Sequence, residues 1–260
     1  MPTERTPVDP HAGQRKVMVV TGGSRGIGAA VCRAAATAHY DVVLNYAASA
    51  AIADDLADEL RELGSRVLPV QADVGVEADV VRLFDTVDEW FGRVDVLVNN
   101  AGIAGGYGPL DTVTEDMLAR LWAVNITGPF IAAREAARRM RTDLGGRGGT
   151  IVNISSKASV LGGPNEWVYY AASKGALDTM TVGLSKELAP FGIRVNGVRP
   201  GLIESDFHDY APAGRIERLA PTVPMLRSGT ADEVTGAVLY LAGDASSYVT
   251  GTFIDVAGGR

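Results

Sequence analysis

Cysteine is nearly absent from this sequence, which contains Cys32 and no other. A single thiol excludes an intrachain disulfide and fits a reducing interior, so we expect a cytoplasmic protein. Histidine is scarce too. His11, His39 and His208 are scattered and show none of the spacings of a metal site, so we expect no bound metal.

Long apolar runs are also missing. No stretch approaches the ~20 apolar residues of a membrane span, so we expect no membrane partner. Residues 1–13 include prolines but no apolar core of a signal peptide, and we interpret them as a flexible tail. The net charge of -7 argues against a general nucleic-acid-binding surface.

Short apolar runs are abundant, and they alternate with helical patterns through the rest of the chain. The expected strands are 16–20, 41–46, 67–70, 94–98, 151–154, 193–198 and 252–256. The expected helices are 29–38, 50–63, 77–91, 113–141 with an interruption near Gly128-Pro129, 170–189 and 232–241, while 202–223 is irregular to helical. This alternation predicts an α/β protein, a single Rossmann-type doubly wound domain over residues 14–260, with a parallel sheet and helices on both faces.

A glycine-rich turn, residues 21–28, joins the first strand to the first helix. Glycine lets the backbone approach a pyrophosphate, and a helix N-terminus offers free N–H groups to it. The same glycines also occur in ordinary tight turns between a strand and a helix. The strand and helix on either side favour a nucleotide-phosphate site.

The second strand ends in Asn45-Tyr46, with no carboxylate to hold the ribose 2′-hydroxyl of NAD. Arg25, in the glycine turn, can pair with a 2′-phosphate. We therefore expect NADP(H) to be preferred, with NAD(H) still possible.

Tyr170 and Lys174 lie four residues apart in an expected helix and so project from one face of it. An ammonium one turn away is expected to lower the pKa of the phenol, which makes proton transfer to a carbonyl oxygen possible. Tyr169 is five residues from Lys174 and should point elsewhere. Taken alone, Tyr170 and Lys174 also fit an aromatic ring packed under the aliphatic part of a lysine. Asn125, a polar residue on an otherwise apolar helix, fits either a hydrogen-bonded core residue or a site residue.

Together these motifs resemble the short-chain dehydrogenase/reductase family. Its landmarks occur in order after the tail: Thr21-Gly22-x-x-x-Gly26-Ile27-Gly28, Asp73, Asn99-Asn100-Ala101-Gly102, Asn125, Ser156, Tyr170-x-x-x-Lys174 and Pro200-Gly201. The run 161–176 and the ending 248–259 resemble glucose-dehydrogenase-like members most.

The resemblance implies a seven-stranded sheet, a nicotinamide cofactor and four catalytic residues. Tyr170 would exchange a proton with the substrate oxygen, while Ser156 hydrogen-bonds the carbonyl. Lys174 would lower the tyrosine pKa and hold the nicotinamide ribose, and Asn125 would anchor a water that returns the proton.

The implied cofactor site extends from the glycine turn along the strand ends. Asp73 and Val74 would meet the adenine, Asn99 the adjacent ribose, and the Ile203 backbone the carboxamide. With the residues argued above, the predicted cofactor-binding set is Gly22, Ser24, Arg25, Gly26, Ile27, Gly28, Asn45, Tyr46, Asp73, Val74, Asn99, Ala101, Gly102, Tyr170, Lys174, Pro200, Gly201, Ile203 and Ser205.

The expected reaction is NADP(H)-dependent interconversion of a secondary alcohol and a ketone. Alternatives are a 3-oxoacyl-carrier-protein reductase, against which the net charge of -7 argues, a glucose 1-dehydrogenase-like sugar oxidation, and a non-catalytic NADP-binding protein. Ser156 precedes Tyr170 by one residue more than is common in the family, and the extra residue falls within 162–168. Substrate inference from relatives is therefore unsafe here.

The substrate pocket is expected to be apolar to mixed. Its candidate residues are Tyr107, Leu161, Trp167, Leu202, Phe207 and Tyr210, with Glu166 and His208 adding polarity. The expected helices 113–141 and 170–189 carry apolar residues on several faces, which indicates burial on several sides. The family pairs these helices across a dimer axis, so we expect a homotetramer acting on a small molecule.

Overall fold

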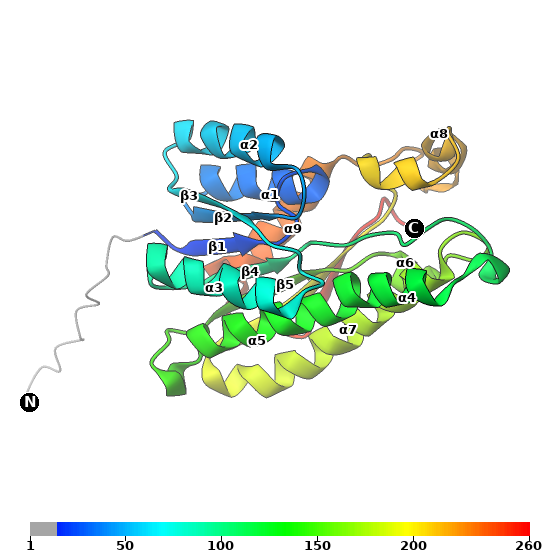
Figure 1. Cartoon of the computed structure of the whole chain (residues 1–260). Helices are drawn as coiled ribbons and strands as arrows, with labels where there is room; N and C mark the ends of the chain where they lie inside the picture. The colour runs from blue at the N-terminus through cyan, green and yellow to red at the C-terminus, as the bar shows by residue number, and fades with distance from the viewer. Residues whose placement is uncertain (1–14) are drawn as a thin grey trace, which may run out of the picture.

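The computed structural model describes residues 15–260, and the tail predicted for residues 1–13 lies outside them (Figure 1). Within the described residues a parallel sheet has the order β3-β2-β1-β4-β5-β6-β7. Its strands are β1 (Val17–Val20), β2 (Asp41–Tyr46), β3 (Val67–Gln71), β4 (Val96–Asn99), β5 (Gly149–Ile154), β6 (Ile193–Pro200) and β7 (Phe253–Val256). Pro69 is tolerated because β3 is an edge strand, where a missing N–H breaks no pairing on the outer side.

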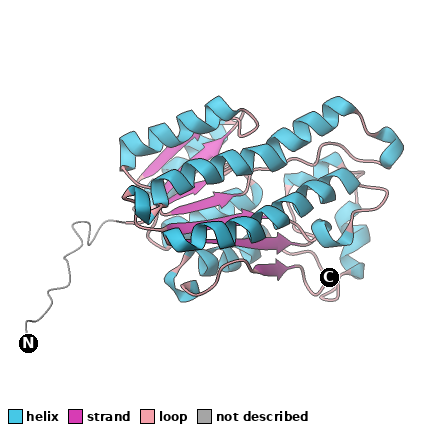
Figure 2. Cartoon of the chain, turned by 90° about the horizontal axis from the view of Figure 1, so that it is seen from below, coloured by secondary structure: helices cyan, strands magenta, loops and turns pink. Residues whose placement is uncertain are grey.

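Helices cover both faces of this sheet (Figures 1 and 2). One face packs against α1 (Gly26–Thr37), α2 (Ala50–Glu62) and α9 (Ala231–Ala242), and the other against α3 (Glu77–Phe91), α5 (Gly128–Met140) and α7 (Val168–Leu188). Successive strand residues alternate between the two cores: Met18 and Val20 point to one, Val17 and Val19 to the other. The predicted doubly wound α/β fold is confirmed.

The long helix expected over 113–141 is divided differently from the prediction. A 3₁₀ turn (Leu110–Thr112) precedes α4 (Glu115–Trp122), a π-helix (Ala123–Thr127) follows, and α5 begins at Gly128. The Thr114 hydroxyl accepts from Met117 N at 3.3 Å and so begins α4. Gly128-Pro129 therefore begins the separate helix α5 rather than interrupting one long helix, since proline suits a first helical turn.

Two further boundaries differ near the site. The helix expected to begin at Tyr170 begins two residues earlier, at Val168, and the short helix α6 (Ala158–Leu161) was not predicted. The irregular segment 202–223, which we call the lid, contains a 3₁₀ helix (Asp206–Tyr210), α8 (Arg215–Leu219) and a 3₁₀ turn (Ala220–Thr222).

The parallel strands all end at one edge of the sheet, where ligand sites of this architecture form. The glycine turn follows β1, the segment 100–102 follows β4, Ser155-Ser156 follows β5, and Gly201 follows β6, which ends at Pro200. Figure 1 places α6, α8 and the chain end on this side of the molecule. Within residues 15–260 no helix combines the length and apolarity needed to cross a membrane.

Candidate active site

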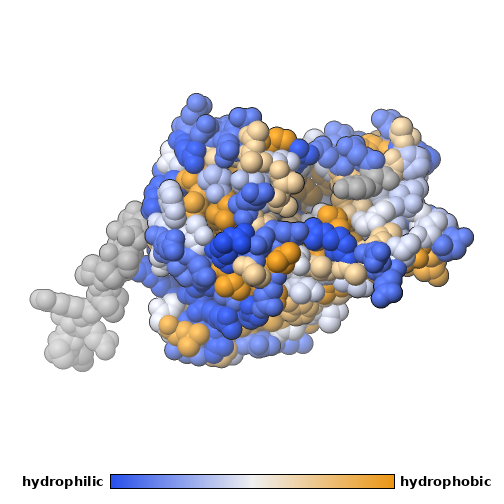
Figure 3. Space-filling view, in the orientation of Figure 1, coloured by the Kyte–Doolittle hydropathy of each residue, from blue (hydrophilic) through white to orange (hydrophobic). Residues whose placement is uncertain are grey.

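A cavity of about 800 Å³ extends along this edge, from the glycine turn to the lid. The surface is hollowed between α2 and the lid (Figure 3). The predicted site residues that line it are Gly22, Arg25, Gly26, Ile27, Gly28, Asn45, Asp73, Val74, Ala101, Gly102, Ser156, Tyr170, Lys174, Pro200, Gly201, Ile203 and Ser205. The fold thus brings residues from both halves of the chain to one cavity.

The glycine turn is built for close backbone approach. Gly22 and Gly26 have φ of 62° and 51°, which favour glycine, and a Cβ on Gly28 would overlap the Gly22 carbonyl and lie 2.5 Å from Asn100 Nδ2. The first turn of α1 contains no acidic residue, and no side chain caps it. Its N–H groups and its positive dipole end therefore suit an anion.

Of the two neighbouring asparagines, Asn100 borders the cavity and Asn99 does not, so the ribose contact expected of Asn99 stays a prediction. The Asn99 side chain is 2% exposed and donates to Asn153 Oδ1 at 3.0 Å, because it belongs to the last residue of β4 and points into the core. Asn100 lines the cavity instead and donates to the carbonyls of Thr21 and Gly22 at 2.9 and 3.0 Å. Neighbouring side chains of a strand point to opposite faces, and this alternation was the sequence signal that only one of the two asparagines faces the cavity.

The end of β2 supports the turn rather than exposing polar side chains. Asn45 accepts from Gly22 N at 3.2 Å and donates to Ala72 O at 2.9 Å, so its amide braces the turn. Ser24 and Tyr46 were also predicted to bind the cofactor, but neither lines the cavity. Arg25 reaches over this end and donates to Ser49 Oγ at 3.0 Å.

Asp73, the predicted adenine contact, lies on the same side of the cavity with its carboxylate already engaged. One oxygen accepts from Gly75 N at 2.9 Å, and the other pairs with Arg120 at 2.9 Å. Arg120 lines the cavity and was not among the predicted residues, because α4 is distant from the strand ends in sequence.

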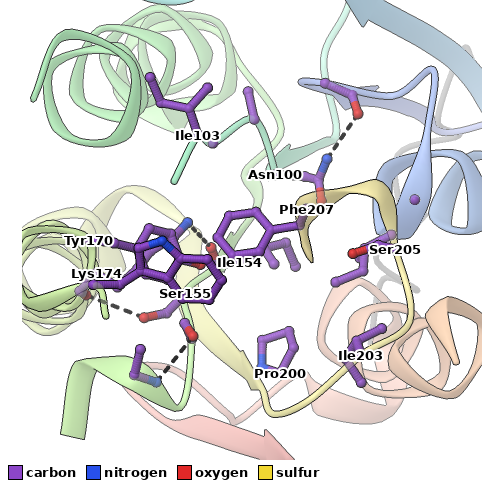
Figure 4. Close-up of a pocket in the computed structure, with 18 of the residues that line it drawn as sticks. Asn100, Ile103, Ile154, Ser155, Tyr170, Lys174, Pro200, Ile203, Ser205 and Phe207 are labelled. Atoms are coloured by element: carbon purple, nitrogen blue, oxygen red, sulfur yellow. Dashed lines mark hydrogen bonds between the residues drawn. The ribbon is translucent and has the colours of Figure 1, made fainter. Parts of the chain in front are cut away.

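Tyr170 and Lys174 lie together on the α7 face that borders the cavity (Figure 4). The Lys174 Nζ donates to Ile154 O at 2.8 Å and lies 5.8 Å from the centre of the Tyr170 ring. The Ser156 hydroxyl is hydrogen-bonded to the Tyr170 phenol, and its oxygen also accepts from Ala158 N at 3.1 Å. A proton donor, a cation and a second hydroxyl are thus within reach of one another.

The expected lowering of the tyrosine pKa by Lys174 is wrong in this structure. Burial raises the pKa of Tyr170 to about 12, and the hydrogen bond with Ser156 opposes that rise. Burial also lowers the pKa of Lys174 to about 8, against the charge of Asp178, which raises it. At neutral pH the phenol therefore keeps its proton, while the lysine is charged below about pH 8.

Asn125 is fully buried in the π-helix and does not line the cavity. Its oxygen accepts from Ile103 N at 2.9 Å, and its amide donates to Ile103 O at 2.9 Å and to Ser173 Oγ at 3.0 Å. The side chain therefore fastens the loop after β4 to α7, on the helix that carries Tyr170. The water-anchoring role implied by the family resemblance stays a prediction.

The wall next to Tyr170 is largely apolar. Leu161, Trp167, Leu202 and Phe207 line the cavity as predicted, and Glu166 adds one carboxylate. Tyr107 stands behind Trp167, with ring centres 5.5 Å apart, and does not line the cavity. The side chains of His208 and Tyr210, also predicted here, lie outside the described part of the chain.

Phe207, from the lid, packs on the tyrosine (Figure 4). Its ring centre lies 5.0 Å from that of Tyr170 and 5.2 Å from that of Trp167. The substrate end is therefore bounded by three aromatic rings.

The residues present fit a nicotinamide dinucleotide. The open helix N-terminus and close-approach glycines suit its pyrophosphate, and the phenol and ammonium lie at the other end of the same cavity. A cavity of about 800 Å³ is within the usual range for cofactor sites.

Comparison with known proteins agrees with this geometry. The family model described as enoyl-(acyl carrier protein) reductase matches residues 22–260. The uncharacterized oxidoreductase YgfF of Escherichia coli is 44% identical over 94% of this chain and 99% of its own. A 3-oxoacyl-[acyl-carrier-protein] reductase of Synechocystis is 38% identical over 94% of this chain and 96% of its own.

Solved structures show the same likeness. A blue fluorescent protein from a metagenomic library, in complex with NADPH, is 38% identical with a TM-score of 0.86, over 94% of this chain and 97% of that one. A short-chain dehydrogenase of Burkholderia cenocepacia in complex with NADP is 35% identical with a TM-score of 0.87, over the same shares. With its landmark residues gathered around one cavity and its relatives matching almost end to end, this chain belongs to the short-chain dehydrogenase/reductase family of oxidoreductases.

Proposed function

We propose that this protein is an NADP(H)-dependent oxidoreductase that interconverts a secondary alcohol and a ketone. The observation that carries the proposal is the shared cavity: Tyr170, Lys174 and Ser156 border the same hollow that begins at the glycine turn. A nicotinamide bound there would supply the hydride that the ketone carbon accepts.

The chain's own residues would supply the proton and the orientation. In reduction, Tyr170 gives its Oη proton to the ketone oxygen, and its high pKa keeps that proton in place at neutral pH. Ser156, hydrogen-bonded to the same phenol, orients the carbonyl next to it. Lys174 holds a positive charge beside the tyrosine below about pH 8, and Asn125 keeps the loop after β4 fixed against α7.

The NADP(H) preference rests on charge at the adenosine end. Arg25 is half exposed beside the glycine turn, and β2 ends without a carboxylate that would repel a 2′-phosphate. The NADPH- and NADP-bound relatives support this choice.

A carrier-protein reductase is the second candidate, favoured by the identity with the Synechocystis enzyme. The cations at the cavity are mostly paired with acids of this chain, Arg120 with Asp73 and Arg215 with Glu166, and the net charge is -7. An acidic carrier would therefore find little free positive charge. Sugar oxidation needs polar groups for several hydroxyls, and the wall next to Tyr170 supplies few.

The test is a panel of ketones, secondary alcohols, glucose and a 3-oxoacyl thioester, each assayed with both cofactors by the change in nicotinamide absorbance. The proposal expects turnover of ketones or secondary alcohols with NADP(H). Turnover confined to the acyl thioester or to glucose would favour the corresponding alternative. Cofactor binding with no turnover anywhere on the panel would favour the non-catalytic alternative.

We further propose a single domain over residues 14–260, a cytoplasmic location and a homotetramer. Phe130 on α5 and Val182 on α7 are 46% and 37% exposed, and Tyr240 and Tyr248 near the chain end are more than one-third exposed. Exposed apolar residues on two separate regions suit two interfaces. Light scattering should give four times the chain mass of 27.2 kDa, and a monomer mass at micromolar concentration would refute the assembly.

A further inference from the structure

Glu166 joins three segments that surround the substrate end of the cavity. Its Oε2 pairs with Arg215 Nη2 of α8 at 2.6 Å, and its Oε1 accepts from the Tyr107 hydroxyl at 3.2 Å. Its backbone carbonyl accepts from Gly108 N at 3.0 Å. The lid, the loop after β4 and the loop before α7 are therefore fastened at one residue, in the region of the extra residue noted above.

The two charged side chains of this junction that line the cavity are matched. Arg215 is 9% exposed, and both it and Glu166 line the cavity. Desolvation alone would raise the pKa of Glu166, but the bonds to Arg215 and Tyr107 and the nearby Arg218 lower it, so the carboxylate stays ionised. Arg218 lies 3.7 Å from the carboxylate and is half exposed, so water screens its charge.

The same arginine supports the aromatic wall. The Arg215 guanidinium lies over the Trp167 ring, 4.2 Å from its centre, and Trp167 contacts Phe207 and Tyr170. A cation on one face and two rings along the others fix the orientation of the indole. The wall that a substrate meets is then electrically neutral and mostly apolar.

We propose that the ion pair between Glu166 and Arg215 determines substrate specificity, by selecting uncharged, flat ketones or alcohols and excluding those that carry a charge on the part of the molecule that meets this wall. This inference rests on the proposed function and names the substrate class for the same site. A charged substituent placed at this wall would lose its water and find each potential partner already paired. The two residues act as a positioning pair, because they touch Trp167 and the lid rather than the reacting atoms.

The proposal predicts opposite effects when either charge is removed. Glu166→Gln keeps the size of the side chain and a carbonyl oxygen for Tyr107, but leaves the cation of Arg215 uncompensated. Selectivity should then shift toward anionic substrates. Arg215→Gln leaves the carboxylate with only the half-exposed Arg218, 3.7 Å away, and should shift selectivity toward cationic substrates.

The experiment compares three flat ketones of similar shape: acetophenone, para-acetylbenzoate and the para-acetylphenyl trimethylammonium ion. Turnover is measured with NADPH, and binding to the NADP-saturated protein is measured by calorimetry. The wild type should favour acetophenone over either ion by about tenfold or more in kcat/KM. Glu166→Gln should raise the kcat/KM for para-acetylbenzoate relative to that for acetophenone by about tenfold or more. Arg215→Gln should raise the relative kcat/KM for the trimethylammonium ion by a similar factor.

Glu217→Gln is the matched control for Glu166→Gln, because it changes the net charge by the same amount. Glu217 is exposed on α8, the helix of Arg215, and lies outside the cavity lining. It should leave both ratios unchanged. A merely structural role would lower the activity on all three ketones together and leave the ratios constant, which would overturn the proposal. Failure of acetophenone to bind would also overturn it.

The outcomes separate this inference from the proposed reaction. If the ketones bind with the predicted selectivity but none is turned over, the reaction is wrong and the selection of uncharged ligands stands. If the ketones are turned over with no selectivity between neutral and charged forms, the reaction stands and this inference falls.

Discussion

Replacing Tyr170 with phenylalanine tests the proposed chemistry most directly. The change removes one oxygen, with its hydrogen bond to Ser156 and the proton it would give to the ketone. The ring keeps its contacts with Trp167 and Phe207, at 6.3 and 5.0 Å between ring centres. We therefore expect a folded protein that has lost about 1 kcal/mol of stability.

The kinetic loss should be much larger. General acid–base catalysis by a positioned group contributes about 10²- to 10⁴-fold, which is about 3–5 kcal/mol of barrier. Cofactor affinity should be retained, since the glycine turn and Arg25 are distant from the change. Single-turnover reduction, followed by the loss of NADPH absorbance in a stopped-flow instrument, isolates this step from product release.

Tyr169→Phe is the matched control, and it tests the helix register. Four residues of helix turn the side chain by about 40° from Lys174, whereas five turn it by about 140°. The Tyr169 hydroxyl donates to Glu166 O at 3.3 Å, and that carbonyl also accepts from Gly108 N, so it stays satisfied without the tyrosine. The control should keep kcat within about threefold. Equal losses in the two variants, or a dead Tyr169→Phe, would refute the assignment.

Four further predictions concern the cofactor, the lysine, the glycine turn and helix α9. Arg25→Ala should raise the KM for NADPH by about tenfold or more and leave the KM for NADH nearly unchanged, and equal shifts would contradict the 2′-phosphate role. Because burial lowers the pKa of Lys174 from 10.5 to about 8, the ammonium charge is present below pH 8 and lost above it. The kcat/KM for ketone reduction should therefore fall above that pH. A pH profile that stays flat to about pH 10 would exclude a need for the ammonium. Gly28→Ala should weaken cofactor binding about tenfold or more in calorimetry, because its Cβ would lie 2.5 Å from Asn100 Nδ2. In contrast, Gly236→Ala on α9 meets nothing within 4 Å and should raise the free energy of unfolding by about 0.5–1 kcal/mol.

The sequence predicted the fold class and most of the cavity lining because both depend on local patterns. Alternating strands and helices require a parallel sheet, and every strand of such a sheet ends at the same edge. Glycines at the turn after β1 and the spacing of Tyr170 and Lys174 then predict the two ends of one site. These inferences need only chain order and the period of each element.

Local sequence patterns do not determine the direction or the environment of a side chain. Asn99 and Asn100 are chemically identical, and the packing of β4 determines which amide faces the cavity. Asn125 lies in a π-helix that no residue pattern predicted. Its hydrogen bonds to the backbone of Ile103 hold the loop after β4 in place. The direction of the Tyr170 pKa shift was misjudged because burial, which raises the pKa, outweighs the hydrogen bond with Ser156, which lowers it.

Tertiary structure alone brought together Glu166, Arg215 and Tyr107, which are spread over more than one hundred residues. Nothing in the spacing of these residues indicates an ion pair, since the loop and lid that carry them have no regular period. Their meeting depends on how irregular segments pack over the strand ends, and packing is a property of the whole fold. The sequence by itself determined the family and the fold and predicted the reacting groups, whereas the shape and charge of the wall next to Tyr170 were decided in three dimensions.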